Sequence, residues 1–170
     1  QDRVRWQAEL ARLHRDPLPE TVIRQRLQKI EAQLPADPPY AIRKELAQVR
    51  IRLTDDHDSS RAQQQALRRL ALQNGDRDTA RLMQINEIFD SHSGANMERS
   101  LRALDRVRLD MREASPEVRD AMAMAYAYMY WDVGNFELAL RHLLQSRELA
   151  RSQPRPDPGR VAERGEAIAR

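Results

Sequence analysis

Residues 115–139 read SPEVRDAMAMAYAYMYWDVGNFELA, and the pattern in this stretch decides the expected fold class. Ser115 offers a side-chain cap for a helix N-terminus, and Pro116 fits the first turn, where its missing N–H costs no hydrogen bond. Glu117 adds a negative charge near the positive end of the helix dipole. These three signals together predict a helix over residues 116–133.

The apolar run inside this stretch has to be distinguished from a strand. Small and large apolar residues alternate over 121–131, which resembles the period of two seen in strands. The length of the run, its alanine content and the cap signals favour a helix that is packed on both flanks. Gly134 and Asn135 then predict a turn, after which helical spacing resumes over 135–150.

Helical periodicity extends over most of the remaining chain, and no convincing strand pattern occurs. Short breaks rich in Pro, Gly, Asp and Ser separate the helical segments, and Ser60 with Gln63 resembles a capping box at the start of one of them. Because the connections are short, neighbouring helices are expected to be antiparallel. About eight helices are predicted, over 2–15, 19–34, 40–53, 60–73, 77–90, 96–113, 116–133 and 135–150.

Composition narrows the functional classes. The chain has 170 residues, 41% of them hydrophobic and 32% charged, which suits one domain with a core. The absence of Cys excludes disulfides, a thiol nucleophile and thiolate zinc sites. The 29 basic residues are interleaved with 26 acidic ones, which indicates a solvated mixed-charge surface and no nucleic-acid partner. No apolar run approaches about 18 residues, so no transmembrane helix is expected.

The ends of the sequence predict a fragment of a longer protein. The chain starts at Gln1 without a Met, and residues 160–170 read like the opening of another helix. We therefore expect an N-terminal helical pair over 1–36 and a helical array over 37–151. A proline-rich break and the start of a truncated further helix are expected over 152–170. Any membrane contact would come through segments outside this sequence.

Two predicted turns are similar to each other. Residues 75–80 read GDRDTA and residues 134–139 read GNFELA, with a weaker copy at 95–100. This pattern resembles the turn of the tetratricopeptide repeat, and Ala127 and Tyr130 also match positions of that family. The resemblance implies antiparallel helical hairpins stacked as a right-handed, tetratricopeptide-like solenoid. It is best over 117–151, moderate over about 60–113 and weak before residue 59.

A degenerate, arginine-rich array of this kind resembles the N-terminal sensor regions of bacterial membrane-anchored signalling proteins, diguanylate cyclases especially. The resemblance implies a non-enzymatic sensory or input region that recognises a protein, a peptide or a small ligand. It also implies a periplasmic or extracytoplasmic location in an inner-membrane protein. Three alternatives stay open: a constitutive scaffold, a dimerisation module that forms a homodimer, and a cytoplasmic repeat domain of a transcription regulator.

The aromatic and methionine-rich helix is the most informative candidate site. In tetratricopeptide-like arrays one face of each first helix lines a concave groove, and Met and aromatic side chains suit adaptable apolar recognition. By this resemblance the groove residues are Ala121, Met124, Tyr128, Trp131 and Asp132. The competing interpretation is that Tyr128 and Trp131 belong to the core.

No pattern in the sequence supports catalysis, a metal or a cofactor. The acidic run at 55–58 lacks the spacing of a calcium loop and is expected to be a cap-rich turn. His92 between two serines is expected to be an exposed loop residue, and His14 and His142 are expected to be solvated among arginines. We therefore predict no catalytic residue, no metal ligand and no cofactor.

Overall fold

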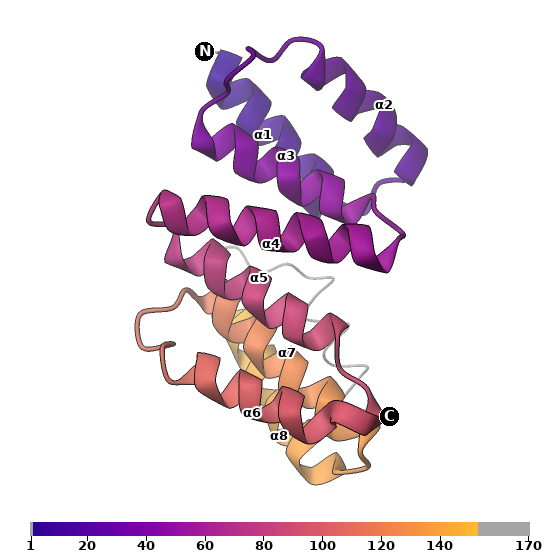
Figure 1. Ribbon diagram of the computed structural model, residues 1–170, viewed down its shortest axis with the longest axis vertical. Coiled ribbons are helices and arrows are strands. Elements are labelled where there is room, and N and C mark those ends of the chain that lie inside the picture. Colours follow the sequence, from indigo (N-terminus) through magenta and orange to yellow (C-terminus); the bar gives the residue numbers. More distant parts are fainter. Residues whose placement is uncertain (1, 153–170) are drawn as a thin grey trace. The chain divides into compact units, whose positions relative to one another are not determined.

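The computed structural model describes residues 2–152, and every regular element in this range is helical (Figure 1). The prediction of an all-α chain with about eight helices is confirmed for these residues. The further helix predicted near the C-terminus and the break before it lie outside the described residues, apart from Ser152. The helices are α1 (Asp2–Arg15), α2 (Glu20–Glu31), α3 (Tyr40–Arg52), α4 (His57–Gln73), α5 (Arg77–Asp90), α6 (Met97–Arg108), α7 (Pro116–Asp132) and α8 (Phe136–Arg151), with a 3-10 turn η1 (Gly94–Asn96) before α6.

The chain divides into two compact units between Gly75 and Asp76. The first unit contains α1 to α4, with α1 packed against both α2 and α3 and with α4 packed against α3. Its core is a cluster of aliphatic side chains. The cluster consists of Leu10, Leu13, Ile23, Leu27, Ile30, Ile42, Leu46, Val49 and Leu53. This division differs from the expected one at residue 36, because Ile42, Leu46 and Val49 of α3 share a core with α1 and α2.

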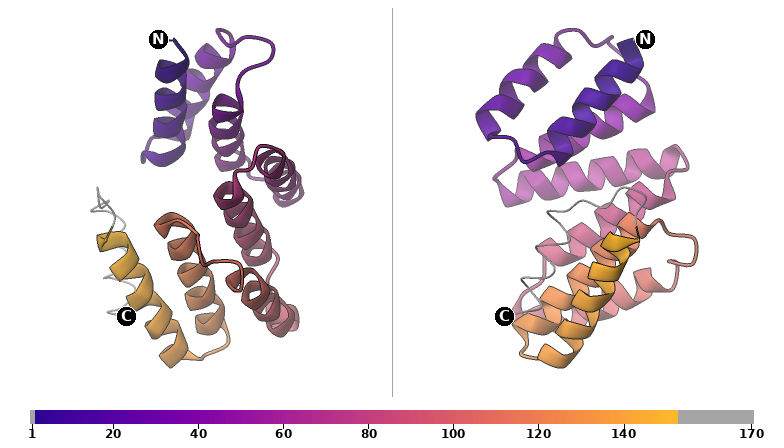
Figure 2. Two further views of the ribbon diagram at one scale, coloured as in Figure 1. Left: turned by 90° about the vertical axis from the view of Figure 1, so that its left-hand side faces the viewer. Right: turned by 180° about the vertical axis from the view of Figure 1, so that it is seen from behind.

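The second unit is built around α7, which packs against α5, α6 and α8 (Figure 2). Its core mixes aliphatic, methionine and aromatic side chains. The buried members are Ile85, Met97, Leu104, Val107, Ala114, Val118, Met122, Ala125, Tyr126 and Met129. The prediction that 116–133 is a helix packed on both flanks is confirmed.

The turn between α7 and α8 follows its sequence signals closely. Gly134 has a φ of 75°, a left-handed conformation that glycine adopts at little steric cost. The side chain of Asn135 accepts a hydrogen bond from the Leu138 N–H at 3.3 Å and caps α8. Ala127 and Ala139 are both buried where the two helices pack. These local features form a tight antiparallel hairpin.

Three helix boundaries differ from the sequence prediction by three residues or more: the end of α2, at Glu31 and not at 34, the start of α4 and the end of α6. The predicted capping box is wrong: α4 starts three residues earlier, because Asp56 caps it by accepting from the Ser59 N–H at 2.7 Å. Hydrogen bonds from the Ser59 side chain and, to a smaller extent, from the Ser59 N–H lower the pKa of Asp56. Helix α6 ends at Arg108 and not at 113, and the following turn lets the Asp110 carboxylate bind Arg81 at 3.0 Å.

Candidate functional site

The five predicted groove residues share one face of α7, as the helical period requires. Ala121 and Met124 are partly buried, and Ala121 packs against the core of the second unit. Tyr128 and Trp131 are each 43% exposed, so neither is sealed inside the described core. Asp132 is exposed at the C-terminal end of the helix. The exposed part of the predicted site is therefore its C-terminal half.

Trp131 joins an apolar surface that continues onto α8. Its ring meets Phe136 edge-to-face, with ring centroids 5.0 Å apart and an interplanar angle of 71°. Phe136 is 57% exposed, and Leu140 and Leu144 follow it at steps of four residues, each 41% exposed. We call Tyr128, Trp131, Phe136, Leu140 and Leu144 together the hairpin surface. It is an exposed apolar strip, and the concave groove expected around it stays a prediction.

Tyr128 and Asp132, at the end of α7, are held by contacts with Phe89 and His92 that the sequence did not predict. The Tyr128 ring packs against Phe89 of α5 at 5.9 Å between centroids, and Phe89 packs against His92 at 4.9 Å. His92 Nε2 lies 2.9 Å from an Asp132 carboxylate oxygen, and its Nδ1 contacts the Phe89 carbonyl. No local signal could have found this pair, because 40 residues separate the two side chains.

His92 is not the exposed loop residue that the sequence predicted, since only 15% of its side chain is accessible. Burial by itself lowers the pKa of His92, but the hydrogen bonds to the Phe89 carbonyl and to Asp132 outweigh it and raise the pKa. The reason is that only the protonated ring donates from both nitrogens at once. His92 therefore holds the loop after α5 against the end of α7.

The opposite side of the hairpin is held by a stack of three rings. The ring of His142 on α8 lies 4.9 Å from Tyr126 and 5.7 Å from Tyr130, nearly parallel to both. The prediction that His142 is solvated is wrong, and burial lowers its pKa. The Tyr126 hydroxyl donates to Asp105 at 2.6 Å, and burial followed by this contact raises the tyrosine pKa.

A buried polar contact also fixes α8 to α7. The Ser146 hydroxyl donates to the Asp120 carboxylate, and both residues are at most 3% exposed. Hydrogen bonds between buried groups are costly to break, because each partner is then left without one. The hairpin surface therefore lies on a scaffold whose two helices are held in one arrangement.

The described residues offer little for metal binding or membrane spanning. Within 2–152, no group of three or more His, Cys, Asp or Glu side chains is placed to hold a metal ion. None of the helices in that range combines the length and the apolar character needed to cross a bilayer. Asp56 in the predicted cap-rich turn caps α4, which agrees with the interpretation of that turn.

Comparison with known proteins gives no match: no family model, no curated protein and no solved structure is similar to the chain.

Proposed function

We propose that this chain is a non-enzymatic recognition module that binds an apolar segment of a protein partner on the hairpin surface. The observation that carries the proposal is the exposure of Tyr128 and Trp131, each 43%, beside three further exposed apolar side chains. Aromatic residues dominate the energetics of protein interfaces, and contiguous exposed apolar patches mark such sites. The hydrogen-bonded scaffold under the surface limits the conformational entropy that binding would cost.

The expected occupant is a peptide or helix that presents aliphatic side chains. The hairpin surface itself contains no charged residue, so an apolar segment fits it better than a charged one. Leu140 and Leu144 lie one helical turn apart, which suits a partner helix with residues at similar spacing. A second copy of this chain is the alternative occupant and would make the module a dimerisation unit.

We further propose that the hairpins belong to a tetratricopeptide-like solenoid in the input region of a bacterial signalling protein of the diguanylate cyclase type, outside the cytoplasm. Support comes from the turn at Gly134, its Asn135 cap, and the two alanines that lie buried between α7 and α8. In repeat arrays each unit contacts mainly its neighbours, so a docked partner can change their stacking and bias an output domain.

Peptide selection tests the proposed function. The immobilised chain is used to select peptides from a displayed library, and the affinity of the selected peptides is then measured by calorimetry. Trp131→Ala with Phe136→Ala is expected to weaken binding by on the order of 2 kcal/mol or more, about 30-fold. Leu109→Ala is the matched control, because Leu109 is 83% exposed in the same unit but lies outside the hairpin surface.

Three outcomes of this experiment contradict the proposal. The first is a selection without any shared apolar pattern, and the second is equal weakening by the control variant. The third is concentration-dependent dimerisation in sedimentation that Trp131→Ala abolishes, which would assign the surface to a second copy of the chain.

A further inference from the structure

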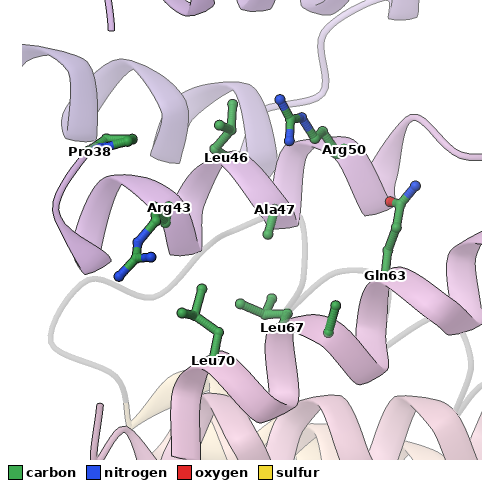
Figure 3. Close-up of a pocket in the computed structure, with 9 residues that line it drawn as sticks. Pro38, Arg43, Leu46, Ala47, Arg50, Gln63, Leu67 and Leu70 are labelled. Atoms are coloured by element: carbon green, nitrogen blue, oxygen red, sulfur yellow. The ribbon is translucent and has the colours of Figure 1, made fainter. Parts of the chain in front are cut away.

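A pocket in the first unit lies between α3 and α4, and none of its lining residues belongs to the hairpin surface (Figure 3). Its volume is about 470 Å³, which falls within the range of about 300–1,000 Å³ typical of small-ligand sites. Figure 3 shows Ala47 of α3 pointing toward α4, where Leu67 and Leu70 form the facing wall. The small side chains of Ala47 and Ala66 leave space that larger residues would fill.

Most of the surface that lines this pocket is apolar. Leu67 is 2% exposed, while Leu70 and Ala47 are partly buried. An aliphatic ligand chain lying on these three residues would remove further apolar surface from water, at about 25 cal/mol for each Å². At about 30 Å³ for each non-hydrogen atom, the volume of one liquid water, the pocket takes at most roughly 15 such atoms.

The charged side chains that line the pocket are all basic. Arg43 and Arg50 both line the pocket, and no Asp or Glu among the described residues does so. Arg50 already binds Glu31, with its two nitrogens 2.7 and 3.2 Å from one carboxylate oxygen. Its charge is therefore largely matched within the protein.

Arg43, in contrast to Arg50, has no carboxylate bound to it among residues 2–152. Its Nε is inaccessible to water, and no acceptor among residues 2–152 hydrogen-bonds to it. A carboxylate is the acceptor that matches a planar guanidinium best, because two parallel N–H bonds can form. The pocket thus combines an aliphatic wall with one unmatched cation at the end where Arg43 and Leu70 lie (Figure 3).

We propose that this pocket binds an aliphatic monocarboxylate, whose acid group pairs with Arg43 and whose hydrocarbon chain lies on Ala47, Leu67 and Leu70. One negative charge balances the single unmatched guanidinium, and a chain of about eight carbons fits the volume. This small-ligand site is independent of the proposed protein-binding function, because all of its lining residues belong to the first unit.

Calorimetry on the whole chain tests the site with three probes of equal chain length: octanoate, octanol and octylammonium. Octanoate is expected to bind one to one with a Kd below about 1 mM. Octylammonium is expected to bind at least ten-fold more weakly, because it meets Arg43 with a like charge. Absence of saturable octanoate binding, or equal binding of octylammonium, overturns the proposal.

Two arginine variants test whether Arg43 binds the acid group of the ligand. Arg43→Met keeps an unbranched side chain as far as the position of Nε but removes the guanidinium, and it is expected to weaken octanoate binding at least ten-fold. Arg26→Met is the matched control, since Arg26 is an exposed arginine of the same unit outside the pocket. Equal weakening by both variants would show unspecific attraction between the acid and a basic chain, and would overturn the site.

Filling the pocket gives a second test. Ala66→Leu is expected to weaken octanoate and octanol alike, because it occupies the apolar wall. Methyl NMR spectra of the unaltered chain locate the ligand whether or not this variant folds. Octanoate is expected to shift the signals of Ala47, Leu67 and Leu70, and shifts confined to the hairpin surface would overturn the proposal.

Discussion

The hydrophobic cores of the two compact units are built from different kinds of side chain. The first unit fills its core cluster with Leu, Ile and Val, whereas the core cluster of the second unit adds Met and Tyr. Helix α7 contacts three other helices of its unit, so its polar side chains Asp120 and Tyr126 need partners inside the structure.

Two arginines of the first unit donate hydrogen bonds to the ends of neighbouring helices. Arg52 donates from one nitrogen to the carbonyls of Leu13, His14 and Asp16 at 2.8–3.0 Å, which satisfies the C-terminus of α1. Arg24 donates to the Leu53 carbonyl at 2.9 Å in the same way. Both units also bury polar side chains, Glu45 and Gln64 in the first and Asp120 and Ser146 in the second, so the composition of the apolar cores is what distinguishes them.

The largest expected effect is the loss of unfolding free energy when one buried core side chain of either unit is truncated. Leu13→Ala and Met129→Ala each remove a side chain that is 0% exposed, and each is expected to cost about 3 kcal/mol in its own unit. Trp6 packs against the first core and Trp131 lies in the second unit, so their fluorescence reports the two separately. Urea titrations of the variants Trp131→Phe and Trp6→Phe, each with one remaining tryptophan, provide the measurement.

Each alanine substitution is expected to lower the urea concentration at the unfolding midpoint that the tryptophan of its own unit reports. The midpoint reported by the tryptophan of the other unit is expected to stay unchanged. A common shift of both midpoints would show that the two cores unfold as one cooperative unit. The two units would then differ in which residues pack together, but they would not be separate units of unfolding.

A smaller effect is expected from polar contacts. Arg52→Met removes the donor at the end of α1, and Tyr126→Phe removes the hydroxyl that binds Asp105. We expect a loss of roughly 1–2 kcal/mol in each case, because Arg52 and Asp105 are exposed and water partly replaces the lost contact. The same fluorescence titrations measure both, and a loss below about 0.3 kcal/mol for Tyr126→Phe would contradict the role given to the Tyr126–Asp105 hydrogen bond.

The smallest effect concerns the two histidines of the second unit. NMR titration is expected to give His92 a pKa above its ordinary value of 6.5 and His142 a pKa below it. Asp132→Asn is expected to lower the pKa of His92 and to leave that of His142 unchanged, because only His92 contacts this carboxylate. Equal shifts of both histidines would contradict the assigned contact.

These shifts affect stability with opposite signs. The raised pKa of His92 gives a contribution that is complete below pH 6.5 and is lost as the pH rises through the folded-state pKa. The lowered pKa of His142 gives a contribution that is present above pH 6.5 and is lost as the pH falls. The His92 contribution, less than about 1 kcal/mol for a pair with an exposed carboxylate, is obtained by comparing the unaltered chain with Asp132→Asn between pH 6 and 8.

The sequence by itself determined where most helices lie. Ser115 with Pro116, Asp76, and the pair Gly134 and Asn135 are local signals, because a cap or a turn is made by residues only a few positions apart. The shared face of the five predicted groove residues is equally local, since it follows from the helical period.

Only the tertiary structure decided which of those residues are exposed and what holds them. The His92–Asp132 contact, the ring stack on His142, the Arg81–Asp110 ion pair and the surroundings of Arg43 all depend on side chains that lie far apart in the sequence. A helical period fixes which residues share a face, but the arrangement of the helices fixes what that face meets.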